Sequence, residues 1–196
     1  PYGPVALICP PDLLEQELDA IPERVTLSAL GTLTAAEARH YARVLAQARR
    51  PALIAAEDVH WNDAGAALEK LAEMLAAPVY VAPYTAMLPI SSRSPHYAGY
   101  LPPSRKQIAE RLAAHDALFF VGGIGMRTTL YSDAIFKQPK LWIGNDPGVL
   151  GSEGEFEIAT ITDTRSALTG IARAAQSISS RRPALKTSQR PQAALP

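Results

Sequence analysis

Three closely spaced glycines and one arginine have the clearest potential for chemistry in this sequence. Gly122, Gly123 and Gly125 follow a short apolar run, and Arg127 comes two residues later. A dinucleotide-binding turn has the pattern Gly-x-Gly-x-x-Gly directly after a strand. Residues 123–125 match its first half, but Thr128 stands at the third glycine position. Two interpretations stay open: a nucleotide contact with Arg127 as phosphate partner, or a tight turn that needs positive φ.

Two further groups follow other apolar runs. After ALIAA (residues 52–56) come Glu57 and Asp58, where a phosphate-binding turn would have glycine. A Cβ blocks close backbone approach there, and two carboxylates repel a diphosphate. Asp146 could accept hydrogen bonds from ribose hydroxyls, or it could belong to a plain turn over Asn145–Gly148.

Histidines and the single cysteine give no metal or triad pattern. His40 and His115 are predicted at the surface, on or at the end of helices, whereas His60 and His96 lie in loops from which either could reach a pocket. Zinc needs three or four clustered ligands, and the spacing of the histidines predicts no such cluster. Cys9 by itself excludes an internal disulfide and a multi-cysteine metal site, which fits a reducing cytoplasm.

Neither a nucleophile elbow nor an aromatic stacking platform stands out. The sequence contains no Gly-x-Ser-x-Gly. Trp61, Tyr80, Phe119 and Trp142 are interpreted as packing residues.

Composition excludes two classes of partner. Lys plus Arg and Asp plus Glu both number 19, so no net field draws the chain to nucleic acid or to an anionic membrane. No apolar run reaches the roughly 18 residues that span a bilayer. The start, PYGPVALICPP, has no basic region and is not interpreted as a signal peptide, so we expect a cytoplasmic protein.

Strands and helices alternate through most of the chain. Apolar runs bounded by turn residues predict strands at 52–56, 79–82, 117–121, 141–143 and 157–161. Expected helix caps are the Thr34–Glu37 and Ser104–Gln107 capping boxes, Asn62, and Asp163 or Thr164. Val5–Ile8 is a possible further strand without a local partner, and 83–103 is expected to be one long loop.

This alternation predicts an α/β fold: a three-layer, doubly wound parallel sheet of about five or six strands with helices on both faces, of Rossmann-like NAD/FAD-binding topology. The expected central domain covers residues 34–176. Residues 177–196 turn to Ser, Arg, Pro and Gln and are expected to be a linker or disordered tail.

Four stretches resemble the central domain of thiamine-diphosphate-dependent enzymes, nearest to the benzoylformate decarboxylase and acetolactate synthase group. They read RPALIAAEDV, AAPVYVAPYTAMLPISSRSPHYAGYLPP, HDALFFVGGIGMRTTLY and KLWIGNDPGVLG. The opening GPVALICPPDLLEQE is similar to the end of the pyrimidine-binding domain in those enzymes. Residues 1–33 would then close that preceding domain, and 177–196 would lead to a pyrophosphate-binding domain.

The resemblance implies that these residues hold no catalytic machinery. In the family, a glutamate of the N-terminal domain activates the cofactor, and a Gly-Asp-Gly motif of the C-terminal domain holds Mg²⁺ and the diphosphate. No Gly-Asp-Gly occurs here. Some members carry FAD or ADP in the central domain, but Glu57–Asp58 and the segment 128–131 argue against FAD. Thr129 stands where benzoylformate decarboxylase has a pocket histidine, which argues against benzoylformate as the substrate.

The sequence therefore predicts a non-catalytic scaffold domain of a thiamine-diphosphate-dependent 2-oxo acid decarboxylase or carboligase. Thiamine diphosphate and Mg²⁺ would belong to the parent enzyme and none to this chain, and the partners would be the flanking domains and sister subunits of a homo-oligomer. The alternative is a stand-alone ADP-, NAD- or FAD-binding module at Gly122, Gly123, Gly125 and Arg127. A sirtuin-like deacetylase, the third possibility, usually needs four zinc-binding cysteines, which one cysteine cannot supply.

Overall fold

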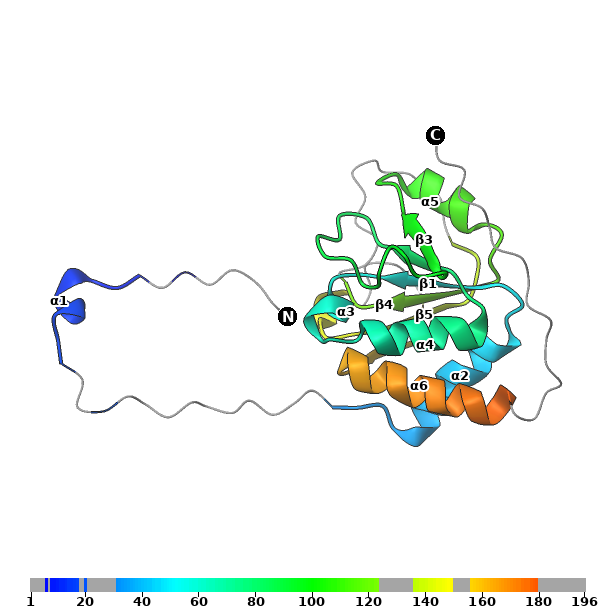
Figure 1. Ribbon diagram of the computed structural model, residues 1–196, viewed down its shortest axis with the longest axis horizontal. Helices are drawn as coiled ribbons and strands as arrows, with labels where there is room; N and C mark the ends of the chain where they lie inside the picture. Colours follow the sequence, from blue (N-terminus) through cyan, green and yellow to red (C-terminus); the bar gives the residue numbers. More distant parts are fainter. Residues whose placement is uncertain are drawn as a thin grey trace.

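A computed structural model describes residues 6, 8–17, 20, 31–123, 136–149 and 156–179. Its centre is a sheet in which every pair of neighbouring strands is parallel, in the order β3-β2-β1-β4-β5-β6. Helices cover both faces of this sheet (Figure 1). The predicted three-layer, doubly wound α/β fold is confirmed.

The six described strands are short, as is usual for a parallel sheet. Their bounds are β1 Pro51–Ala55, β2 Val79–Val81, β3 Tyr97–Tyr100, β4 Ala117–Val121, β5 Lys140–Gly144 and β6 Ile158–Ile161. β1 and β4 lie at the centre, and all residues of both are buried. Burial on both faces explains why these two strands read as continuous apolar runs.

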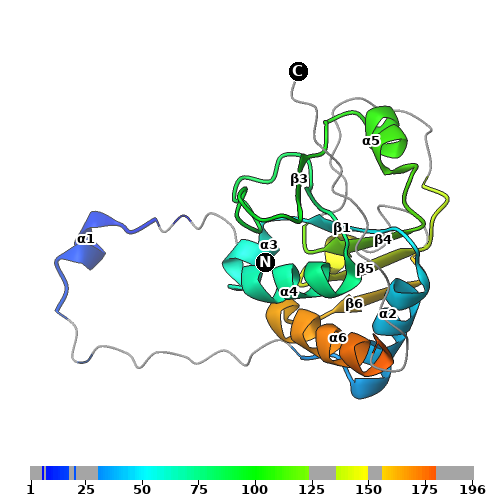
Figure 2. The same cartoon turned by 45° about the vertical axis from the view of Figure 1, so that its right-hand side comes forward.

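Helices are distributed unequally over the two faces. The described α-helices are α1 Pro11–Leu14, α2 Ala35–Gln47, α3 Asp58–Trp61, α4 Gly65–Leu75, α5 Arg105–Leu112 and α6 Thr164–Ser179. A 3₁₀ turn lies at Pro147–Val149. α2, α4 and α6 pack on one face, and α5 lies on the other (Figures 1 and 2).

Alternate residues of each central strand enter two different cores. Leu53 and Phe119 point to the α2–α4–α6 side, where they join Tyr41, Leu68 and Ile171. The residues one position later on both strands point to the α5 side and join Ile108 and Leu112. This period of two is what the pleat of a strand requires.

Local sequence explains the starts of two helices as predicted. Thr34 Oγ1 accepts a hydrogen bond from the Glu37 N–H at 3.2 Å, and the Glu37 carboxylate accepts one from the Thr34 N–H at 2.8 Å. Asp163 Oδ1 accepts from the Ser166 N–H at 2.7 Å at the start of α6. Each contact satisfies a backbone donor that the helix itself leaves free.

Two predicted caps were wrong. Ser104 precedes α5, but its side chain makes no capping hydrogen bond. Asn62 ends α3 rather than starting α4, because its side-chain amide donates to the Asp58 carbonyl at 2.7 Å. The backbone turns again after Asn62, at Asp63 with φ of 49°, so α4 begins after Ala64 without a side-chain cap.

The prediction of one long loop over residues 83–103 was also wrong in part, because this segment contains the edge strand β3. β3 pairs with β2 through Val79–Tyr97 and Val81–Tyr100, with a register shift between these pairs. Of the predicted strand Val5–Ile8, Ala6 and Ile8 are not in a strand, and the other two residues lie outside the described ones. Within the described residues, no helix is long and apolar enough to cross a membrane.

Candidate functional site: the switch point of the sheet

The candidate site lies at the carboxyl ends of β1 and β4. After β1 the chain continues to β2 on one side, and after β4 it continues to β5 on the other. The two strands pair in register from Pro51–Ala117 to Ala55–Val121. In doubly wound sheets such a reversal opens the crevice in which ligands bind.

Gly122 and Gly123 form the turn that follows β4. Both have positive φ, 71° and 76°, a conformation in which a Cβ would be strained. A Cβ on Gly122 would lie 2.7 Å from Asp58 Oδ2, and a Cβ on Gly123 would lie 2.6 Å from Ala56 Cβ. Both glycines are therefore required by the close approach of the β1 turn, as the tight-turn interpretation expects.

Asp58 fills the space next to this turn. Its Oδ2 accepts a hydrogen bond from the Gly123 N–H at 2.6 Å. A carboxylate thus occupies the position on a backbone N–H that a phosphate oxygen takes in a nucleotide-binding glycine turn. The Asp58 side chain is held in place because Asp58 is the first residue of α3 and is buried.

The titratable side chains around the crevice are carboxylates. Burial raises the pKa of Asp58 above its usual value, the hydrogen bond from Gly123 lowers it, and the charges of Glu57 and Asp146 raise it further. These carboxylates come from the loops after β1 and β5, on either side of β4. A diphosphate that entered the crevice would meet all three negative charges.

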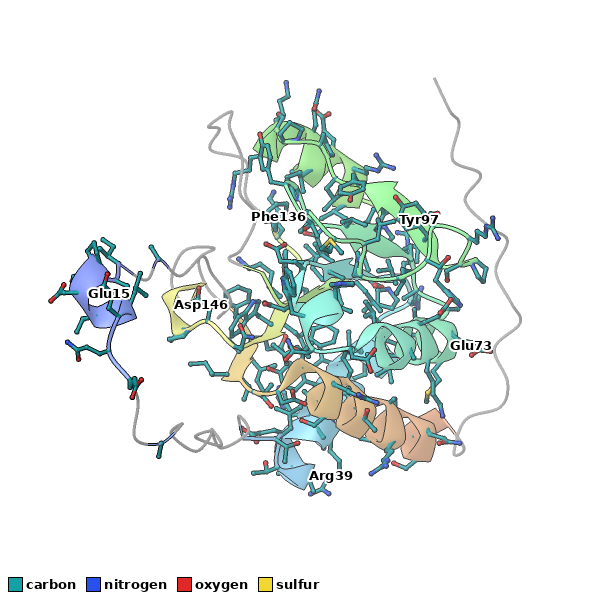
Figure 3. The ribbon with its side chains drawn as sticks, turned by 60° about the vertical axis from the view of Figure 1, so that its left-hand side comes forward. Glu15, Arg39, Glu73, Tyr97, Phe136 and Asp146 are labelled. Atoms are coloured by element: carbon teal, nitrogen blue, oxygen red, sulfur yellow. The ribbon has the colours of Figure 1, made fainter. Side chains whose placement is uncertain are left out.

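Asp146 adopts the turn that was one of its two predicted roles. Its Oδ1 accepts a hydrogen bond from the Gly148 N–H at 2.8 Å, and residues 147–149 form a 3₁₀ turn. Figure 3 shows Asp146 at the rim of the domain. Gly125 and Arg127, the other two predicted site residues, lie outside the described residues.

Three of the four aromatic residues predicted as packing residues are buried, namely Tyr80, Phe119 and Trp142. Trp61 was wrongly placed among them, because it is 48% exposed on α3. His60 was predicted in a loop but lies on the same helix, where it is exposed.

The surface prediction for His115 was wrong too. His115 is half-buried, with Nδ1 3.1 Å from the Arg50 carbonyl oxygen and Nε2 3.1 Å from the Tyr80 hydroxyl. It lies just before β4, at the amino ends of the strands, whereas the crevice lies at their carboxyl ends.

The Asp58–Gly123 contact is the feature that sequence reasoning missed. The sequence placed Glu57 and Asp58 after one strand and the glycines after another, and it predicted that the carboxylates would repel phosphate. It did not predict that Asp58 would bond to the glycine turn. The available signal was the parallel topology, which brings the turns after β1 and β4 to one edge whenever these strands are neighbours.

Residues for holding a metal ion are lacking in the part of the chain that the structure describes. No group of three or more His, Cys, Asp or Glu side chains is arranged there to bind one. The three carboxylates at the crevice do not form such a group. The described residues therefore do not fit Mg²⁺ with a diphosphate, and no chemical step is assigned to them.

A parallel sheet with this strand order defines a doubly wound α/β domain of Rossmann-like topology, and comparison with protein families makes the class more specific. Residues 38–171 match the family model described as the thiamine pyrophosphate enzyme, central domain. The chain belongs to this family.

Solved structures support the same fold. Benzoylformate decarboxylase from Polynucleobacter necessarius is 19% identical, with a TM-score of 0.72 over 83% of this chain and 31% of its own. The thiamine diphosphate-dependent 4-hydroxybenzoylformate decarboxylase of Rhodococcus jostii RHA1 is 25% identical, with a TM-score of 0.69 over 83% of this chain and 29% of its own. The chain thus spans about three tenths of the length of these enzymes.

Proposed function

We propose that the chain is a non-catalytic scaffold domain of a thiamine-diphosphate-dependent 2-oxo acid decarboxylase or carboligase. Family membership supports the class, and the decarboxylases among the similar structures support the type of reaction. In such an enzyme the cofactor supplies the chemistry by acting as an electron sink for a carbanion. The central domain would set the spacing of the two domains that hold the cofactor.

One observation carries the non-catalytic part of this proposal: Asp58 closes the crevice at the switch point. Its carboxylate already bonds to the Gly123 N–H, at 2.6 Å. A ligand phosphate would have to displace a buried side chain and then remain close to Glu57 and Asp146. Both requirements oppose binding of a nucleotide by the described residues.

Exposed apolar side chains at the same edge support the scaffold role. The carboxyl-edge patch consists of exposed residues that follow β1 and β2, together with the last residue of β3: Trp61, Tyr84, Met87, Leu88 and Tyr100. These three strands are neighbours, and the Tyr100 hydroxyl donates to the Thr85 carbonyl at 3.3 Å, which joins the β3 end to the β2 loop. Grouped apolar residues of this kind mark interaction surfaces. The flanking domains or sister subunits of the parent enzyme are the expected partners.

The alternative function, a nucleotide-binding module, is favoured by the strand order, which is that of dinucleotide-binding folds. A ligand present at 100 times its dissociation constant would stabilise the domain by about 2.7 kcal/mol. Thermal unfolding in ADP, NAD⁺ or FAD therefore separates the two proposals. The scaffold proposal expects no change in Tm, and a saturable increase would support the module.

The test of the scaffold role is an activity and binding assay of this chain. With thiamine diphosphate, Mg²⁺ and a panel of aromatic and aliphatic 2-oxo acids, we expect no CO₂ release and no heat of cofactor binding. Turnover above the cofactor-only background, or saturable binding of thiamine diphosphate, would contradict the proposal. A full-length homologue assayed in parallel is the positive control.

A further inference from the structure

β3 is one of the two edge strands of the sheet. β2 pairs with it on one side, and among the described residues no strand pairs with it on the other. The Leu101 N–H donates to the Val81 carbonyl of β2 at 2.9 Å. Because the C=O and the N–H of one trans peptide point in opposite directions, the Tyr100 carbonyl faces away from β2. Backbone groups that face outward at an edge are a template on which a strand of another chain can pair.

Arg111, on α5, bonds to two carbonyls of this edge strand. Its Nη1 donates to the Tyr100 carbonyl at 3.4 Å, and its Nη2 donates to the Ala98 carbonyl at 3.1 Å. Ala98 and Gly99 together lie opposite Tyr80 of β2, because the register shifts between the two pairs of the ladder. Such a bulge leaves backbone groups without a ladder partner, and Arg111 supplies the partner of the Ala98 carbonyl. The fixed fork of N–H donors on a guanidinium allows one side chain to bridge both carbonyls.

Two further contacts hold the guanidinium against the edge. Arg111 Cζ lies 5.7 Å from the centroid of the Tyr80 ring, within the range of a cation–π interaction. Tyr80 is itself buried, and its hydroxyl lies 3.1 Å from His115 Nε2. A Cβ on Gly99 would lie 3.7 Å from Arg111 Nη2, so the backbone of β3 passes close to the guanidinium. Arg111 is therefore fixed by a buried ring on β2 and by the backbone of β3.

We propose that Arg111 closes the β3 edge against strand pairing with a second copy of the chain. The guanidinium takes the position at the Tyr100 carbonyl that an N–H of an added strand would need. Arg111 is exposed, so it also places a positive charge where the second copy would arrive. A two-fold axis at this edge would bring two such charges together. Without Arg111, β3 of one copy would be able to pair with β3 of the other.

Closure of this edge restricts the domain to contacts through side chains. Tyr100 illustrates the division, because Arg111 holds its carbonyl while its exposed ring belongs to the carboxyl-edge patch. Its hydroxyl donates to the Thr85 carbonyl at 3.3 Å, so the same residue also joins β3 to the loop after β2. The inference rests on contacts within the chain and does not depend on which enzyme the domain belongs to.

Arg111→Ala opens the edge and tests the proposal. Sedimentation velocity from micromolar to millimolar concentration measures the self-association of the variant and of the unmodified chain. We expect the apparent dissociation constant for self-association to fall about tenfold in the variant, because each copy gains carbonyls that can accept hydrogen bonds from the other. Isotope-filtered NOEs in a mixture of labelled and unlabelled variant chains should then connect residues 97–100 of one copy with residues 97–100 of the other.

Two control variants separate edge opening from loss of charge and from loss of stability. Lys106→Ala removes a positive charge from an exposed position on the same helix and should leave self-association unchanged. Tyr41→Phe removes a buried hydrogen bond on α2, far from β3 in the fold, and should not cause association either. The proposal is overturned if Arg111→Ala does not associate, if Tyr41→Phe associates equally, or if the NOEs place the interface outside β3.

A measurement on the unmodified chain covers the case in which Arg111→Ala does not fold. A guanidinium that bridges two carbonyls rotates slowly about its Cζ–Nη bonds, so the Nη protons of Arg111 should give separate NMR signals in the cold. Arg43, at an exposed position on α2, is the reference whose Nη protons should give an averaged signal. An averaged signal for Arg111 as well would show that its guanidinium does not hold the β3 carbonyls, and would overturn the proposal.

Discussion

Asp58 is the residue on which the proposed closure of the crevice depends. Its carboxylate is buried, bonds to the Gly123 N–H and lies near the charges of Glu57 and Asp146. A buried carboxylate is costly when charged, even with a backbone N–H bonded to it, and this cost of burial is the main cause of its raised pKa. Under the proposed function, the residue would block the phosphate position at some expense of stability.

Asp58→Asn tests this cost. Because the pKa of Asp58 is higher in the folded than in the unfolded chain, the unmodified protein loses stability as pH rises from about 4 through the folded pKa. Asparagine keeps an oxygen for the Gly123 N–H but carries no charge, so the variant should become more stable relative to the unmodified protein as pH rises from 4 to 7. Chemical denaturation at several pH values measures the difference.

Asp58→Ala is the matched comparison, because it removes the acceptor as well as the charge. We expect it to lower the free energy of unfolding by about 1–3 kcal/mol at neutral pH. If Asp58→Asn is as destabilising as Asp58→Ala at every pH, the carboxylate charge is not the source of the cost.

His115 leads to a second prediction about a single residue, on the pH dependence of stability. The Nδ1–H donates to the Arg50 carbonyl, so the neutral Nε2 accepts from the Tyr80 hydroxyl. Burial lowers the pKa of His115, and protonation would also remove the acceptor at Nε2. A folded pKa below the unfolded value means that this contribution is complete above about pH 6.5 and is lost as pH falls from there through the folded pKa.

His115→Gln should remove that part of the acid sensitivity. Its unfolding free energy should fall less between pH 7 and 5 than that of the unmodified protein. His60→Gln, at an exposed position on α3, is the control and should retain the full pH dependence. Identical pH profiles for all three proteins would contradict the role assigned to His115.

At the scale of elements, α2 is fastened to the sheet by a buried tyrosine. Tyr41 is fully buried, and its hydroxyl donates to the Trp142 carbonyl at 2.7 Å and lies 3.0 Å from Thr160 Oγ1. It therefore links α2 to β5 and β6 at once. Burial raises the pKa of Tyr41 well above its usual value, so the hydroxyl stays protonated.

Tyr41→Phe should lower the free energy of unfolding by about 1–3 kcal/mol, because the Trp142 carbonyl and Thr160 lose a buried partner. The ring and its packing against Phe119, at a centroid distance of 5.7 Å, should remain. Urea denaturation measures the loss. A change below the experimental error would mean that the hydroxyl does not hold α2 on the sheet.

Elements with a strong apolar period could be predicted from the sequence, and weakly patterned ones could not. β1 and β4 are buried on both faces and read as apolar runs, so they were found. β3 was missed because it is a half-exposed edge strand of sequence YAGY with a register shift against β2. β3 forms because it pairs with β2, and the local sequence pattern does not predict that pairing.

At the same scale, caps were predictable when both partners were close in sequence. The Thr34–Glu37 box formed as expected, whereas Asn62 turned back to the Asp58 carbonyl. The contact between Asp58 and Gly123 joins residues 65 positions apart, so it follows from the strand order rather than from spacing.

For the whole molecule, the proposed function assigns one exposed apolar surface to contacts with partners. The carboxyl-edge patch exposes aromatic and aliphatic side chains for the proposed neighbouring domains.

The central claim is that the switch-point crevice is closed to nucleotides by Asp58. The most direct measurement is a ¹H–¹⁵N NMR titration of the chain with ADP, followed at the Gly122 and Gly123 amides. The account predicts that both signals keep their positions up to millimolar ADP, with the Gly123 signal shifted downfield by its hydrogen bond to the carboxylate. Saturable movement of the Gly123 signal with ADP would contradict the account, because it would show that a phosphate can take the place of Asp58.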